Sequence, residues 1–154
     1  MRLPQSLSPR RPAPTAGVTL RVLLLLFVLL LSACASAGKA ANALDAAQYA
    51  WSGAIRWGDF TGAANLVDPA VREADPLTDL ELERYEQVQI TRYRDLGASR
   101  DIEGGTAVRD IEIGVVNRHT MAERAVRYRE TWRWDPEAQA WWITSGLPDL
   151  WDGD

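Results

Sequence analysis

Residue types that build metal sites and disulfides are nearly missing from this chain of 154 residues. Cys34 is the single cysteine and His119 the single histidine. A disulfide within the chain is excluded, and zinc or iron–sulfur sites are not expected, because they take several Cys or His ligands. No Ser or Cys nucleophile motif accompanies His119, which we place in an exposed turn. We therefore expect no catalytic residue, no metal and no cofactor.

Acidic residues are also absent from the first part of the chain, where Asp45 is the earliest. An unbroken apolar run, 22–31, follows four arginines: Arg2, Arg10, Arg11 and Arg21. A positive segment, a short apolar run and small residues after it are typical of a secretory signal. A helix of this length rises only ~15 Å, half of what a hydrocarbon core requires, so a membrane-spanning helix is not expected.

The apolar run leads directly into Leu31-Ser32-Ala33-Cys34. This motif resembles the lipobox of bacterial lipoproteins. The resemblance implies cleavage before Cys34, a diacylglycerol on its sulfur and usually a further acyl chain on its new amine. Two or three chains would hold the protein to a membrane, because each buried methylene contributes ~0.8 kcal/mol. Ala35 is not the aspartate that retains enteric lipoproteins in the inner membrane, so the resemblance implies an outer-membrane lipoprotein, which we expect to face the periplasm.

The sequence predicts three parts: a signal peptide over 1–33, a lipidated tether over 34–41, and a globular domain over 42–154. Without the signal the chain keeps all 21 acidic residues but only 13 of its 17 basic ones, which leaves a net charge of −8. This charge argues against binding nucleic acid, where neutralisation of phosphates dominates affinity. We expect the membrane as one partner, and an envelope protein or a small apolar ligand as another.

Two or three helices are predicted in the first half of the domain. The first begins near Asn42, buries Leu44, Trp51 and Ile55, and ends at Gly58. A second helix is capped by Asp59 or Thr61 and stops at Asp68-Pro69. Residues 70–77 are predicted to be a connector, and the capping box Thr78-Asp79-Leu80-Glu81 then predicts a short helix over 78–85.

The second half changes to the period of two that is typical of strands. Strands are predicted within 86–96, around 110–116, over 121–134 and over 141–144. The turns between them are marked by Gly104-Gly105, by 117–120 and by 135–139. The fold class is therefore α+β, with the helices packed on one face of a curved antiparallel sheet of about four strands.

This order resembles the nuclear transport factor 2-like superfamily, over residues 42–148. The resemblance rests on Trp-Gly-Asp-Phe between the first two helices, and on Tyr-Arg-Glu-Thr-Trp-Arg-Trp followed by a loop and Trp-Trp-Ile-Thr. It implies a cone-shaped fold, whose members range from isomerases to pure binding modules. A cystatin-like arrangement is the alternative.

Aromatic residues are concentrated in the last hairpin, where Trp134 and Trp141 are predicted to pair across strands. One interpretation makes these tryptophans core and hairpin edge. The other is an apolar pocket in the mouth of the cone, whose candidate residues are Trp57, Tyr128, Glu130, Trp132 and Trp142.

Glu130 has the same strand parity as Val126, Tyr128 and Trp132, so we expect it on the concave face. A charge buried there must be paired, and Arg124 has the same parity. A structural ion pair, a bulge that turns Glu130 outward, and a pocket base of raised pKa remain open. Arg127, Arg129 and Arg133 are predicted on the opposite face, either balanced by Glu112 and Glu123 in solvent or recognising an anionic envelope polymer.

The sequence therefore favours a cell-envelope lipoprotein whose domain binds a ligand or partner without catalysis. The alternative is a small-molecule isomerase or hydrolase that uses the pocket of the cone. A continuous pocket with an unpaired carboxylate would favour the enzyme, and a filled interior with an exposed apolar patch would favour the binding module.

Overall fold

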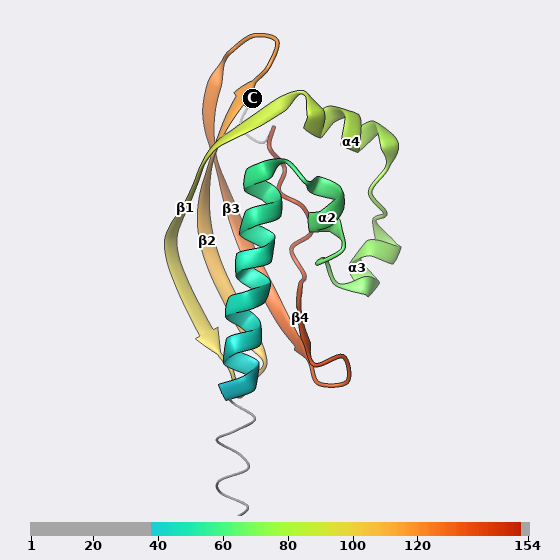
Figure 1. The fold of residues 1–154 in the computed structure, drawn as a ribbon, viewed down its shortest axis with the longest axis vertical. Helices are drawn as coiled ribbons and strands as arrows, with labels where there is room; N and C mark the ends of the chain where they lie inside the picture. The colour runs from blue at the N-terminus through green and yellow to red at the C-terminus, as the bar shows by residue number, and fades with distance from the viewer. Residues whose placement is uncertain (1–37, 152–154) are drawn as a thin grey trace, which may run out of the picture. The chain divides into compact units, whose positions relative to one another are not determined.

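The computed structural model describes residues 38–151. Cys34 and the predicted signal peptide lie outside the described residues. Helical residues 38–57 are followed by α2 (Phe60–Ala64), α3 (Pro69–Ala74) and α4 (Asp79–Glu86), and then by β1 (Val88–Asp101), β2 (Thr106–Asn117), β3 (Glu123–Asp135) and β4 (Ala140–Ile143). The four strands are antiparallel and pair in the order β1-β2-β3-β4 (Figure 1). The predicted α+β class is confirmed.

The turns between the strands lie where the sequence predicts them. Asn117 accepts hydrogen bonds on its side-chain oxygen from the backbone N–H groups of His119 and Thr120, at 2.9 and 3.0 Å. Asp135 accepts in the same way from Glu137 and Ala138, both at 3.0 Å. Short polar side chains that bond their own backbone in this way stabilise turns, which is why the sequence signal is strong here.

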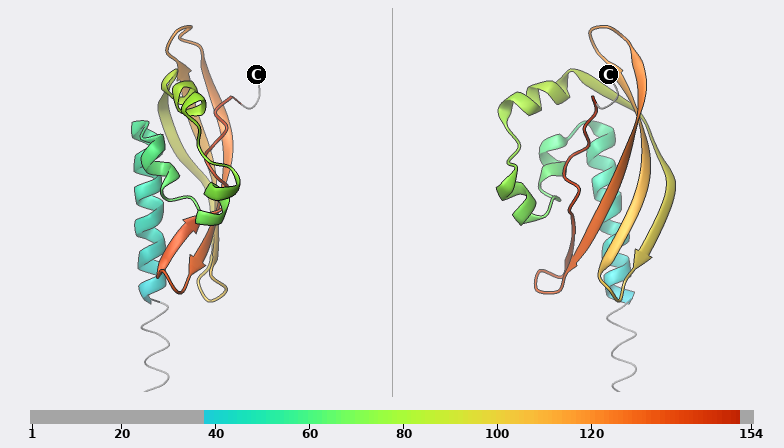
Figure 2. Two further views of the ribbon diagram at one scale, coloured as in Figure 1. Left: turned by 90° about the vertical axis from the view of Figure 1, so that its right-hand side faces the viewer. Right: turned by 180° about the vertical axis from the view of Figure 1, so that it is seen from behind.

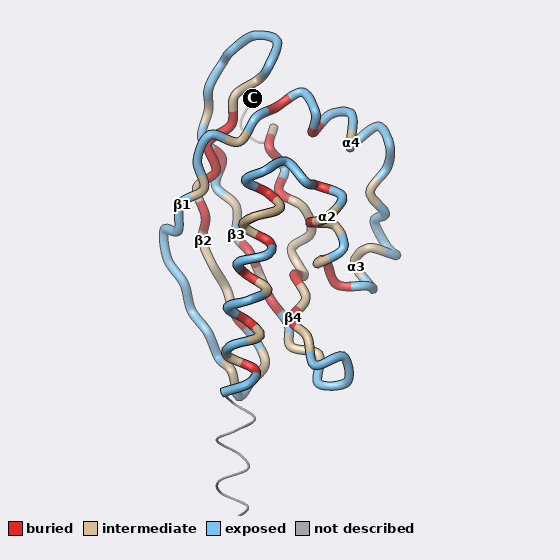
Figure 3. The backbone as a smooth tube through the Cα atoms, viewed as in Figure 1, coloured by how far each residue is buried: buried red, intermediate tan, exposed pale blue. Residues whose placement is uncertain are grey.

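The first helix covers one face of the sheet (Figures 1 and 2). Leu44, Trp51 and Ile55 are fully buried, as their helical spacing predicts. Figure 3 colours the buried positions of the sheet red. The buried residues of β2 and β3 that face the helix are Ala107, Ile111, Ile113, Val115, Val126, Glu130 and Trp132. Alternation along the strands thus directs one side of the sheet to the core.

The predicted start of the first helix at Asn42 is wrong, because residues 38–41 are already helical. Ala40 is buried, and its carbonyl oxygen accepts a 2.9 Å hydrogen bond from Nε1 of Trp141. The small residues of this segment were interpreted as a flexible tether. Alanine is, however, the strongest helix former, and here it also provides an acceptor for a buried indole.

The connector predicted over 70–77 is also wrong in part, because α3 occupies Pro69–Ala74. The Asp68 side chain accepts from the N–H of Ala70 at 2.9 Å, and Pro69 occupies the first turn. The prediction that the second helix stops at Asp68-Pro69 is also wrong, because α2 ends at Ala64. The Asp-Pro pair is instead a helix start, since proline at the first position lacks an N–H that would have no partner there.

The end of the first helix and the starts of α2 and α4 follow the prediction. Gly58, with φ of 74°, ends the first helix in the left-handed conformation that glycine adopts without strain. Asp59 caps α2 by accepting from Gly62 N at 2.8 Å. Thr78 and Glu81 form the predicted capping box of α4.

The opposite face of the sheet exposes Arg127, Arg129 and Arg133, as predicted. The carboxylates that pair with them differ from the expectation. Arg129 contacts Asp110 at 2.8 Å and Arg133 contacts Asp68 at 2.6 Å. Glu112 instead pairs with two arginines of β1, Arg92 and Arg94, at 3.5 and 2.9 Å. Strand parity gives the face of a side chain, but neighbouring loops and strands decide its partner.

Candidate functional site

Glu130 lies at the centre of a buried polar cluster between the first helix and the sheet. It points to the inner face, as its parity predicts, and it is 0% exposed. Its Oε2 accepts from Nε and Nη2 of Arg109, at 2.8 and 2.7 Å, and from Nε1 of Trp132 at 3.1 Å. Its Oε1 accepts from the hydroxyl group of Tyr93. Both oxygens of this carboxylate are thus occupied by donors from the protein itself.

Arg109, and not Arg124, is the partner of Glu130. Arg109 lies directly opposite Glu130 in the register of β2 and β3. Arg124 is six residues away along β3, about 20 Å, and its Nε donates to the carbonyl oxygen of Leu150 at 2.9 Å. Strand parity correctly predicts the face of the sheet on which the partner of Glu130 lies. It does not predict the position of that partner along the sheet. The partner could be found only from the pairing of β2 with β3.

The guanidinium group of Arg109 also joins the sheet to the first helix. Its Nη2 lies 3.3 Å from Ser52 Oγ and 3.5 Å from the Gln48 carbonyl oxygen. Its Nη1 lies 3.7 Å from a carboxylate oxygen of Asp95 on β1. The side chain of Arg109 is only 11% exposed. One arginine therefore connects the helix with three strands.

The electrostatics of the cluster match a carboxylate acceptor, Glu130, with groups that donate hydrogen bonds to it. Burial raises the pKa of Glu130, while the charge of Arg109 and the hydrogen bonds from Tyr93, Arg109 and Trp132 oppose that rise. Burial, and then the neighbouring Glu130 charge, raise the pKa of Tyr93, so its hydroxyl group keeps the proton that it donates. A general base must present a free lone pair to a substrate. Glu130 is enclosed, and its contacts are with internal donors.

Aromatic rings fill the space beside this cluster. Trp51 of the first helix stacks on Tyr128, with ring centroids 6.4 Å apart, and meets Trp132 edge to face at 6.2 Å. The Tyr128 hydroxyl group donates to the carbonyl oxygen of Gly146 at 2.6 Å. These rings pack between the first helix and β3, beside the Glu130 cluster.

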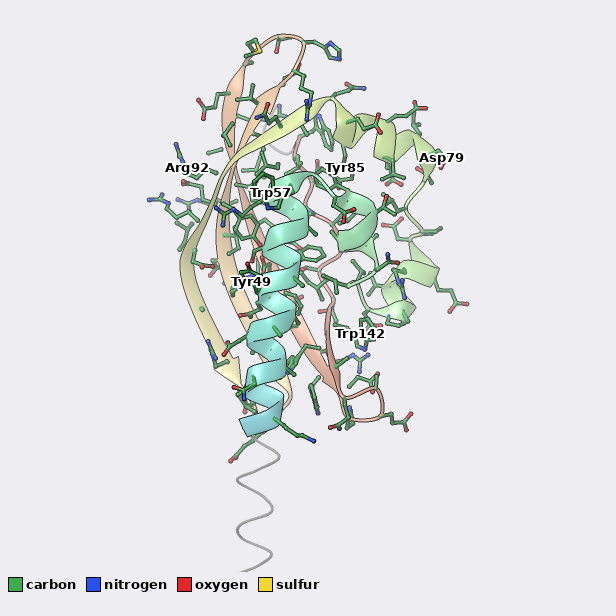
Figure 4. All side chains as sticks on the ribbon, viewed as in Figure 1. Tyr49, Trp57, Asp79, Tyr85, Arg92 and Trp142 are labelled. Atoms are coloured by element: carbon green, nitrogen blue, oxygen red, sulfur yellow. The ribbon has the colours of Figure 1, made fainter. Side chains whose placement is uncertain are left out.

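The five predicted pocket residues do not lie together. The structure brings Tyr128, Glu130 and Trp132 to one buried region. Trp57 is 89% exposed at the end of the first helix, and Trp142 alternates with the buried Trp141 and Ile143 on β4 (Figure 4). Trp134 and Trp141 are opposite in register, with ring centroids 5.6 Å apart, which confirms their predicted cross-strand pairing.

A cavity of about 320 Å³ lies elsewhere, among α2, α3, α4 and the segment 145–151. Its apolar lining is formed by Val67, Val71, Leu77, Tyr85, Leu147 and Trp151. Arg84 lies over the Trp151 ring, 4.0 Å from its centroid. Sequence reasoning missed this cavity, because it depends on α3, which was interpreted as a connector, and on the path of the chain after β4.

Arg72 gives the cavity a polar group without a complete set of partners. Its Nη1 lies 3.4 Å from the side-chain oxygen of Asn65. Its Nε is buried and has no hydrogen-bond acceptor within residues 38–151. Three carboxylates also line the cavity. Glu81 accepts from Thr78 and Asp149 accepts from the N–H of Trp151, whereas the Asp75 side chain makes no hydrogen bond within residues 38–151. The Arg72 side chain lines the cavity, so its guanidinium group offers a cationic donor to a small molecule beside apolar walls.

Within residues 38–151, no group of three or more Asp, Glu, His or Cys residues is placed to hold a metal ion. Across the same part of the chain, no helix is both long enough and apolar enough to cross a membrane.

Comparisons with known proteins give limited guidance. No family model matches the chain, and no curated protein does. Among solved structures, it is similar to the solution structure of a SEC-C motif containing protein from Rhodopseudomonas palustris. The identity is 18%, the TM-score is 0.49, and the match covers 60% of this chain and 68% of that one. This similarity is too distant for a function to be inferred from it.

We predict that Glu130→Gln strongly destabilises the fold. The substitution removes the buried counter-charge of Arg109 and leaves only the exposed Asp95 carboxylate at 3.7 Å, a loss of up to about 3–5 kcal/mol for a deeply buried pair. Urea unfolding at neutral pH measures the difference. Asp110→Asn, in an ion pair with Arg129 on the exposed face, is the matched control and should leave stability nearly unchanged. A Glu130→Gln variant that is as stable as the wild type would identify Glu130 as an uncompensated carboxylate, and would reopen the enzyme hypothesis.

Proposed function

We propose that this protein is a lipid-anchored binding module of the bacterial cell envelope, without catalytic activity. The observation that carries the proposal is the enclosed Glu130 carboxylate, with both oxygens occupied and no exposed surface. It was the one acidic group that parity placed in the predicted pocket. Its pairing with Arg109 gives Glu130 a structural role. Because a paired carboxylate does not present a free lone pair to a substrate, this pairing supports a binding function over general-base catalysis.

The proposed anchor is Cys34, and the support for it is in the sequence. Arginines, a short apolar run and Leu31-Ser32-Ala33-Cys34 occur in the order of a lipoprotein signal. Ala35 after the cysteine supports the outer membrane as the destination. A domain held in this way would act at a membrane surface and face the periplasm.

The fold that we propose is nuclear transport factor 2-like. Support comes from the order of the helices before a four-stranded antiparallel meander, and from the long helix across one face of the sheet. A parallel bridge between Val67 and Ile143 joins the helical half of the domain to its last strand. The interior beside Trp51 is filled, so the ligand site that we propose is the cavity beside α3.

The ligand that suits this cavity is a small molecule with an apolar body and one anionic or strongly accepting group. A volume of about 320 Å³ is within the range of small-molecule sites. Tyr85 and Trp151, with ring centroids 5.2 Å apart, provide aromatic walls. Arg72, whose side chain lines the cavity, provides a cationic donor. A carboxylate on an aromatic or aliphatic body would satisfy both features.

The proposed anchor predicts the mass of the mature protein. Mass spectrometry of protein extracted from membranes should show that residues 1–33 are absent and that Cys34 carries acyl groups. Replacing Cys34 with Ser should move the protein from the membrane fraction to the soluble or uncleaved fraction. An unmodified Cys34, or cleavage at another position, would contradict the anchor but would leave the binding domain untouched.

The proposed cavity predicts binding of naphthoate, an aromatic carboxylate, measured by isothermal titration calorimetry. Val71→Phe, which fills the cavity, and Arg72→Met, which removes the donor, should each weaken binding by ~tenfold or more. Leu80→Phe is the control, because Leu80 lies on α4, is 74% exposed and does not line the cavity. Equal binding by the wild type and Val71→Phe, or no binding by the wild type, would refute this ligand site.

A further inference from the structure

A groove lies between the end of the first helix and the beginning of β1. Two hollows, of about 300 and 200 Å³, adjoin there and share Arg56, Trp57 and Ile90. We call them together the Trp57 groove, which is lined chiefly by Arg56, Trp57, Ile90, Thr91, Arg92 and Arg118. The Trp57 side chain is 89% exposed (Figure 4). A large aromatic ring beside a hollow is the residue type that most often dominates binding at protein interfaces.

The groove adjoins an open edge of the sheet. β1 is an edge strand of 14 residues that pairs only with β2. No strand within residues 38–151 hydrogen-bonds its other edge, so backbone N–H and C=O groups are available there. Register shifts after Ile90 and after Asp95 divide this edge into short segments. Such an edge can accept a short extended chain through backbone hydrogen bonds.

The charge of the groove is opposite to that of the protein. Three arginines and one glutamate, Glu86, line it, although the chain has a net charge of −4. Arg56 makes no ion pair with any residue of the described part. Arg92 is 56% exposed in its side chain and lies 3.5 Å from its carboxylate partner. Arg118 donates from Nε to the carbonyl oxygen of Val88. These cations favour an acidic ligand.

We infer that the Trp57 groove and the adjoining edge of β1 bind an extended acidic peptide segment of a partner protein. Backbone pairing along β1 provides affinity, an apolar side chain of the peptide packs against Trp57, and its carboxylates meet the arginines. This surface shares only Tyr85 with the lining of the proposed naphthoate site and lies outside the proposed anchor, so the inference goes beyond both.

Two other occupants fit the same groove less well. A bilayer would contact an exposed Trp and Arg, but it cannot enter a hollow or pair with successive backbone groups of a strand. A second copy of the chain, joined edge to edge by two-fold symmetry, would bring the same arginines of both copies together. Like charges on adjoining strands are destabilising. An acidic extended segment avoids both difficulties.

The probe is a fluorescein-labelled peptide of alternating glutamate and valine, titrated with the full chain in detergent and followed by fluorescence anisotropy. We expect saturable binding that weakens as salt increases. Trp57→Ala and Arg56→Glu should each weaken it by ~tenfold or more. Tyr49→Ala is the matched control, because Tyr49 is on the same helix, is 83% exposed and lies outside the groove. Val71→Phe should bind the peptide normally, which separates this surface from the cavity.

Several outcomes would overturn the inference. One is the absence of peptide binding, and another is equal binding of a peptide with lysine in place of glutamate. A Tyr49→Ala effect as large as that of Trp57→Ala would show a non-specific aromatic contact. Binding of anionic phosphatidylglycerol vesicles that depends on Trp57, without peptide binding, would assign the surface to lipid. A concentration-dependent dimer that Arg56→Glu disrupts, again without peptide binding, would assign it to a second copy.

Discussion

The ion pair between Glu130 and Arg109 is the interaction on which the rest of the domain depends. A buried pair of charges is costly to desolvate, and it is tolerated only when further hydrogen bonds satisfy both groups. Here Tyr93 and Trp132 donate hydrogen bonds to the Glu130 carboxylate, while Ser52 and the Gln48 carbonyl oxygen lie near the Arg109 guanidinium group. Because the pair and these partners come from the first helix and three strands, the pair fixes how the helix lies on the sheet.

The consequence for function is that the space between helix and sheet belongs to the scaffold. Trp51, Tyr128 and Trp132 fill it around the pair. We therefore propose that binding uses the periphery, where the structure has a cavity beside α3 and a cationic groove beside β1. The two surfaces differ in chemistry. The cavity suits a compact apolar molecule with one accepting group, and the groove suits an extended acidic chain.

The sequence was a good guide wherever local chemistry decides the structure. The capping box at Thr78, the turn at Asn117 and the inward direction of Glu130 follow from neighbouring residues and from strand parity. The sequence failed where one signal has two meanings. Asp68-Pro69 resembles a helix stop although it starts α3, and an alanine-rich segment resembles a tether although it forms helix. The Arg109 partner and the α3 cavity depend on strand register and chain path, which periodicity does not contain.

A double-mutant cycle between Glu130 and Arg109 tests the central claim most directly. The free energy of unfolding is measured for the wild type, Glu130→Gln, Arg109→Met and the double variant. If the pair holds the helix on the sheet, each single variant leaves the other group unsatisfied. The double variant should then lose less stability than the sum of the singles, with a coupling energy above ~1 kcal/mol. Additive losses, within ~0.5 kcal/mol, would show that the two groups act independently and would contradict the account.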